Sequence, residues 1–208
     1  GLFGPQDVAK RVRLPGSDAQ RRVLAGRLVL KPELKFEPHA GPEPVAAGPF
    51  VRSDNGWAEG MHPTDVFLKN TQEVLGPLQE ATAHVRLARF EFLSADRTVR
   101  RAVYGGGPEA TEAIANLGGQ EAQVETRLGG RVVLPPWGFV VEGPRFAAFY
   151  ATQWGGRTYR GGALFTLRLL DGESLAKPGK VRIFHGFGDP AIAWQGGTHE
   201  VRREQTVA

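Results

Sequence analysis

The chain has 208 residues, of which 41% are hydrophobic and 23% charged, a balance typical of a globular protein with one good core or two small ones. Gly and Pro fill 43 positions, which predicts many chain reversals, and the length is too short for a complete (β/α)8 barrel of about 250 residues. The net charge of +4 reflects 20 Arg and six Lys against 22 acidic residues, but these bases are scattered from Lys10 to Arg203, so we expect no nucleic-acid partner.

The sequence contains no Cys, which excludes disulfides, thiolate zinc sites and Cys nucleophiles. No apolar run reaches the roughly 20 residues of a membrane helix, so we expect no membrane partner. The first residues, 1–5, lack the charged start and apolar core of a signal peptide, and the absence of an initial Met indicates a trimmed chain. The composition does not determine the cellular compartment.

The first fifty residues are predicted to be irregular. Residues 22–30 are predicted to form one β-strand or two short ones, and the Pro-rich stretch 37–44 is expected to be a surface wrap or linker. A helix is predicted over 63–77, because Pro63 fits a first turn and Gly76-Pro77 ends or kinks a helix. Its apolar stripe, expected to pack on a sheet, consists of Phe67, Thr71, Val74 and Leu78.

From residue 84 the hydrophobic pattern changes to period two, interrupted by Gly-rich turns. The parity of the apolar residues changes between Leu87 and Phe90, which predicts a bulge near residues 88–89. Further strands are predicted at 99–104, 110–117, 122–128, 132–134, 139–142, 146–152, 163–170, 181–185 and 200–206. The predicted fold class is therefore mainly β, an antiparallel β-sandwich of roughly ten strands with one packed helix. The domain prediction is an irregular segment 1–83 followed by a sandwich 84–208, or two small β-units divided near 143–162.

The loop before the predicted helix holds the densest group of functional side chains. Carboxylates and amides satisfy sugar hydroxyls, and an indole face covers the C–H surface of a pyranose, so this loop is a candidate carbohydrate site. Its predicted binding residues are Asp54, Asn55, Trp57, Glu59 and His62. The alternative is a structural loop in which Asp54 and Asn55 form turns, Trp57 fills the core and His62 caps the backbone.

Other candidate motifs are weaker. In the loop 184–190, His185 and Asp189 flank glycines, which fits a metal or phosphate site less well than a structural turn, since no helix follows. The five His residues show no metal-ligand spacing, so no metal or other cofactor is expected. Three Trp residues could form a sugar platform or, more commonly, part of a sandwich core: Trp137, Trp154 and Trp194.

Residues 113–118 and 132–141, the second segment with the motif Leu134-Pro135-Pro136-Trp137-Gly138, resemble the C-terminal β-domain that follows the barrel in many bacterial glycoside hydrolases. Residues 54–60 and 67–75 resemble the segment that joins the barrel to that domain in uncharacterised members. The resemblance implies carbohydrate metabolism, a neighbouring catalytic domain, and a slight preference for an extracellular or periplasmic location. No catalytic residue is implied, because the barrel strands that carry them are absent from this sequence.

The function predicted from these observations is a non-catalytic accessory β-domain of a glycoside hydrolase that contacts carbohydrate. Two alternatives stay open. One is a stand-alone glycan hydrolase in which Asp54 and Glu59 act as the acid and base. The other is a structural or protein-interaction module, which the turn-dense β pattern would also fit.

Overall fold

The computed structural model describes residues 49–52 and 57–208. Residues 47–208 form one compact unit, which holds the helix α3 and all the described strands. The strand predicted at 22–30 and the Pro-rich wrap predicted at 37–44 lie outside the described residues.

The described chain is mainly β, as predicted, with twelve strands, one α-helix and two short 3-10 helices. The helices are η1 (Pro49–Val51), α3 (Pro63–Thr82) and η2 (Gly107–Glu109). The strands are β1 (Leu87–Phe92), β2 (Val99–Tyr104), β3 (Thr111–Asn116), β4 (Ala122–Thr126), β5 (Gly130–Leu134), β6 (Phe139–Glu142), β7 (Phe146–Trp154), β8 (Arg157–Asp171), β9 (Lys180–Phe187), β10 (Ala191–Trp194), β11 (Gly197–Glu200) and β12 (Glu204–Val207).

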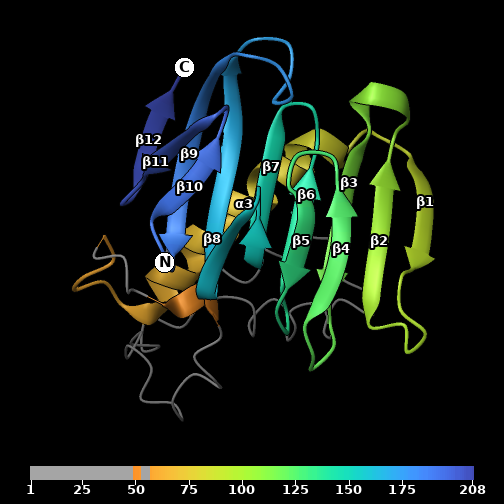
Figure 1. Ribbon diagram of the computed structural model, residues 1–208, viewed down its shortest axis with the longest axis horizontal. Coiled ribbons are helices and arrows are strands. Elements are labelled where there is room, and N and C mark those ends of the chain that lie inside the picture. Colours follow the sequence, from red (N-terminus) through yellow and green to blue (C-terminus); the bar gives the residue numbers. More distant parts are fainter. Residues whose placement is uncertain (1–48, 53–56) are drawn as a thin grey trace, which may run out of the picture. The chain divides into compact units, whose positions relative to one another are not determined.

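One antiparallel sheet organises the unit. Its main path runs β1-β2-β3-β6-β7-β8-β9-β12, with the β4–β5 hairpin attached through β7, while β10 and β11 form a separate hairpin. Figure 1 shows α3 crossing behind the central strands and the two hairpins in front of them. The long sheet therefore has one face toward α3 and the other toward the hairpins, which together make a sandwich-like arrangement.

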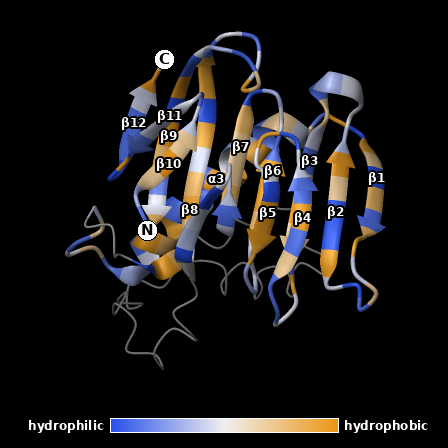
Figure 2. Ribbon diagram, viewed as in Figure 1, coloured by the Kyte–Doolittle hydropathy of each residue, from blue (hydrophilic) through white to orange (hydrophobic). Residues whose placement is uncertain are grey.

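The main core lies on the hairpin face of the sheet. There the ring of Phe149 stacks on Trp154 at 4.5 Å and packs beside Phe165 at 5.5 Å, and Trp194 of β10 stacks on Trp154 at 6.1 Å. A smaller apolar cluster on the helix face joins Val74 of α3 to the central strands. Figure 2 shows hydrophobic residues along the central strands and mostly hydrophilic residues in the loops between them.

The helix begins at Pro63 as predicted but does not end at Pro77. His62 caps the first turn, its Nδ1 accepting a hydrogen bond from the Thr64 amide at 3.2 Å. The helix continues through Pro77 to Thr82. Pro77 is buried, and beyond it the Thr82 hydroxyl donates to the Leu78 carbonyl and the Ala83 amide to the Gln79 carbonyl, so the last turn forms despite the amide that Pro77 lacks.

Most predicted strands are confirmed, and the predicted bulge is found between Leu87 and Arg89. The exception is the β10–β11 hairpin, of which only the last residue fell within a predicted strand. Gln195 and Gly196 connect its two strands, and both have positive φ, at 48° and 78°. This two-residue connection has the positive φ values of a type I′ turn, which suits the twist of an antiparallel pair.

Candidate functional site: a groove between the helix and the sheet

The structure places three residues of the predicted carbohydrate loop, since Asp54 and Asn55 lie outside the described residues. Trp57 is half-buried; its indole N–H donates to the Gly186 carbonyl at 3.0 Å, and its ring packs edge-on against Phe184. Glu59 is exposed, and His62 caps α3. These contacts give Trp57 and His62 structural roles, and carbohydrate binding by this loop stays a prediction.

Of the predicted loop 184–190, residues 184–187 belong to strand β9, so His185 lies in a strand, and only residues 188–190 connect β9 to β10. His185 is fully buried and its ring stacks on Phe165 at 4.7 Å. Asp189 accepts hydrogen bonds from the Ala191 amide and from Arg157, both at 2.9 Å. Partial burial alone would raise the pKa of Asp189, but these two hydrogen bonds outweigh it and hold the pKa below its ordinary value. Across the described ranges, no group of three His, Asp or Glu residues could hold a metal ion.

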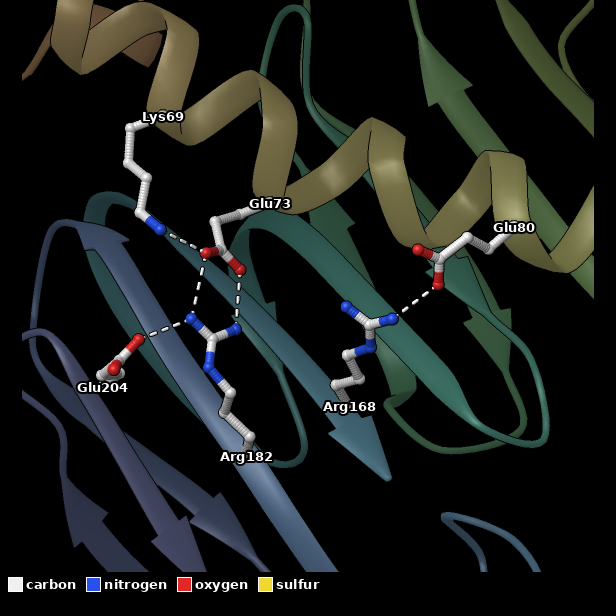
Figure 3. Close-up of polar contacts among 6 residues, drawn as sticks. All are labelled: Lys69, Glu73, Glu80, Arg168, Arg182 and Glu204. Atoms are coloured by element: carbon white, nitrogen blue, oxygen red, sulfur yellow. Dashed lines mark hydrogen bonds and ion pairs between the residues drawn. The ribbon is translucent and has the colours of Figure 1, made fainter. Parts of the chain in front are cut away.

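Helix α3 is attached to the sheet on one side by a cluster of charged residues (Figure 3). Glu73 receives two hydrogen bonds from the Arg182 guanidinium of β9, at 2.8 and 3.0 Å, and a third from Lys69 at 2.6 Å. Arg182 also pairs with Glu204 of β12 at 2.5 Å. We call these four residues the Glu73 cluster.

The charges of the Glu73 cluster stabilise one another. Burial alone would raise the pKa of Glu73, but the hydrogen bonds from Arg182 and Lys69 outweigh it and lower the pKa below its ordinary value. The same pairing raises the pKa of Arg182, which therefore stays charged. Because the guanidinium holds both carboxylate oxygens, the pair fixes the orientation of α3 as well as its position.

On its other side α3 stands away from the sheet, and an apolar groove of about 490 Å³ separates them. Small side chains create the space, since Ala102 of β2 and Ala113 and Ala115 of β3 line it from the sheet. Among the described residues, those that line the groove are Phe50, Phe67, Thr71, Val74, Leu75, Leu78, Phe90, Arg100, Ala102, Ala113, Ile114, Ala115, Phe139 and Val141.

Large apolar side chains at the groove remain open to solvent. Phe67 and Leu75 of α3 are 45% and 44% exposed, and Phe90 of β1 is 51% exposed. Phe50 closes one part, because its ring stacks on Phe139 at 6.0 Å and its carbonyl accepts from Asn70 of α3 at 2.8 Å. Apolar side chains gathered around a hollow, and left partly uncovered, are characteristic of a binding surface.

Part of this site was predicted from the sequence. The predicted stripe of α3 includes Phe67, Thr71 and Leu78, which do line the groove. The stripe was expected to be covered by a sheet, and that expectation is wrong for Phe67, which is 45% exposed. Phe90 and the three alanines were not predicted, since alternating Ala in a strand shows nothing until the opposing element is placed.

Another hollow, of about 340 Å³, is lined by polar and apolar groups in equal measure. Its side chains include Asp96 and Thr98 beside β2 and Gln120 and Glu121 between β3 and β4. Asn116 lies between this cleft and the β5–β6 loop, because its amide nitrogen donates to the carbonyls of Leu134 and Pro135 at 3.1 and 3.0 Å. In that loop Trp137 is 64% exposed, whereas Trp154 and Trp194 are buried.

The described residues thus define a mainly β unit with one α-helix and an apolar groove. Comparison of the chain with protein-family models, curated proteins and solved structures finds no match. Within the described ranges, α3 is too polar to cross a membrane, and no other helix there is long enough.

Proposed function

We propose that this protein binds a small apolar molecule in the groove between α3 and the sheet. The observation that carries the proposal is an apolar hollow of about 490 Å³ between a fixed helix and a row of alanines. Its volume lies in the range of ligand pockets, roughly 300 to 1,000 Å³.

Burial of the exposed rim supplies the driving force. Phe67, Leu75 and Phe90 each keep a large exposed apolar fraction. A ligand that covers about 100 Å² of that surface gains about 2.5 kcal/mol at about 25 cal/mol per Å², in addition to the burial of its own surface. The helix needs no rearrangement for this, because the Glu73 cluster already holds it in place.

The test is a titration of the full chain with N-phenyl-1-naphthylamine, an uncharged dye that fluoresces strongly in apolar surroundings. We expect saturable enhancement in the wild type and at least tenfold weaker binding in Ala113→Leu, whose added methyl groups fill the groove. Ala176→Leu is the matched control, since Ala176 is exposed and lies outside the groove. An absent dye response, or equal binding in wild type and Ala113→Leu, would show that the groove is not a binding site.

A second candidate function is the predicted contact with carbohydrate, for which Trp137 provides a specific observation. This indole is 64% exposed and has a φ of 63°, a conformation that a bulky side chain rarely adopts. Strained backbone that holds an aromatic ring toward solvent is common at ligand sites. Titration of oligosaccharides against Trp fluorescence, in wild type, Trp57→Ala and Trp137→Ala, tests both loops. A response that survives in both variants would count against both.

The accessory role beside a catalytic domain of a glycoside hydrolase stays a prediction from the resemblance of residues 113–118 and 134–138. Carbohydrate binding at Trp137 would support it, whereas an apolar ligand in the groove is independent of it.

A further inference from the structure

The apolar groove has a positive charge at one end. Arg100 of β2 is the only charged residue among the described residues that line the groove. In the β1–β2 register Arg100 lies opposite Phe92, and Ala102 lies opposite Phe90, so both pairs face α3. The rings of Phe90 and Phe92 meet edge-to-face at 5.4 Å, which makes a continuous apolar surface from the groove to Arg100.

A second guanidinium lies close to the first. Arg97 and Arg100 both approach the ring of Phe92, at 5.5 and 5.9 Å from its centre. The Nε of Arg100 donates to the Arg97 carbonyl at 3.2 Å, which leaves the two terminal nitrogens of its guanidinium for another acceptor. The two charges therefore gather where the apolar surface ends.

On the opposite face of β2, an arginine is neutralised by carboxylates. Arg101, the next residue, pairs with Glu91 at 3.1 Å and with Glu112. For Arg97 and Arg100, by contrast, the described part of the chain supplies no carboxylate partner. The groove face of β2 is thus positive and the hairpin face is balanced.

The turn before β2 holds the two arginines in place. Asp96 accepts hydrogen bonds from the Ser94 hydroxyl at 2.5 Å and from the amide and hydroxyl of Thr98 at 3.2 and 2.9 Å. These bonds close the turn that carries Arg97, whose φ is 62°. All three bonds end on Oδ1 of Asp96, and within the described residues no ion pair joins this carboxylate to Arg97 or Arg100.

We propose that the groove binds an amphipathic carboxylate, with its apolar chain between α3 and the alanines and its carboxylate on Arg100 and Arg97. This inference rests on the proposed function and names its ligand class. A planar guanidinium binds a carboxylate through two parallel hydrogen bonds, which an uncharged head group cannot match. An acyl chain suits a hollow whose described lining contains one polar side chain besides Arg100, that of Thr71.

The experiment displaces N-phenyl-1-naphthylamine from the full chain with three molecules of equal chain length, dodecanoate, 1-dodecanol and dodecyltrimethylammonium, each below its aggregation concentration. We expect dodecanoate to displace the dye at about tenfold lower concentration than dodecanol, with the cation weakest. In Arg100→Gln this preference should disappear when the displacement by each molecule is compared with the dye affinity measured for that same variant. Arg203→Gln, a change of an exposed arginine outside the groove, should keep it.

The outcomes separate the inference from the function on which it rests. If the dye binds and the three molecules displace it equally, or if Arg100→Gln keeps the preference, the carboxylate assignment is wrong and the apolar site stands. If the dye does not bind at all, both are wrong. A preference that weakens from 20 mM to 500 mM salt would further support pairing with the partly exposed arginines, because salt screens such charges.

Discussion

The two sides of α3 meet the same sheet in different ways. Toward β8, β9 and β12, charged pairs hold the helix, with Glu73 on Arg182 and Glu80 on Arg168. Toward β2 and β3 the helix faces alanines across a hollow of about 490 Å³. The charged pairs fix the position of the helix. Because the helix is fixed, its other side can stay apart from the alanines, and the groove does not close. The difference shows that one side of the helix attaches it to the sheet, while the other side borders the groove for which we propose binding.

The largest expected effect contrasts the closed core with the open groove. Phe165→Ala should lower the free energy of unfolding by about 3 to 5 kcal/mol, because a fully buried ring on the hairpin face leaves a cavity. Phe90→Ala at the groove should cost less than about 1 kcal/mol, since half of that ring is already exposed. Urea unfolding of both variants measures the difference. Similar losses would mean that the groove is packed as tightly as the core.

The next effect concerns the Glu73 cluster. Glu73→Gln should cost about 2 kcal/mol at pH 7, because it removes the shared carboxylate that Arg182 and Lys69 both contact. Dye binding should weaken as well if the cluster is what keeps the helix in position. Glu173→Gln is the control, since the pair of Glu173 with Lys177 is exposed and should contribute less than about 0.5 kcal/mol.

The contribution of Glu73 should also depend on pH. Its folded pKa lies below the ordinary value of 4.5, so the stabilisation is fully present above about pH 4.5 and is lost as the pH falls through the folded pKa. The difference in unfolding free energy between wild type and Glu73→Gln should therefore be constant from pH 7 to pH 5 and shrink below that. A difference that grows in acid would contradict the pairing with Arg182.

Much of the fold was readable from the sequence because its signals are local. Alternation and Gly-rich turns located β2 through β9, and the change of parity after Leu87 located the bulge. Two features depended on tertiary contacts instead. The helix runs past Pro77, which is buried in the fold, and the four-residue strands of the β10–β11 hairpin are too short to show a clear period. The Gln195-Gly196 pair was the one available signal for that hairpin.

The candidate site was harder to predict. Aromatic and acidic residues before the helix predicted a site in the loop around Trp57. In the structure Trp57 donates a hydrogen bond to the sheet and His62 caps α3. The groove is made by the small size of Ala102, Ala113 and Ala115, and by the place at which α3 crosses the sheet. Composition and spacing predict neither the groove nor the crossing point of α3. A small residue in a strand indicates a hollow only when the element opposite it is known.

The finest comparison lies in a single row of residues on the helix face. The strand register places Ala102 beside Ala113, then Val141, then Ala148. Ala148 is fully buried, whereas Ala102 lines the groove. The same substitution at the two alanines therefore probes the closed and the open part of one face.

Ala148→Leu should cost about 1 to 3 kcal/mol, because added methyl groups have no space in a packed layer. Ala102→Leu should change stability by no more than about 1 kcal/mol, and in the stabilising direction, because the same groups bury themselves against Phe90 and α3. Thermal and urea unfolding of the two variants give the sign directly. If Ala102→Leu destabilises the chain as much as Ala148→Leu, the space beside Ala102 is filled by side chains in solution. A stabilised Ala102→Leu that no longer binds dye would show instead that this space is held open at a cost in stability.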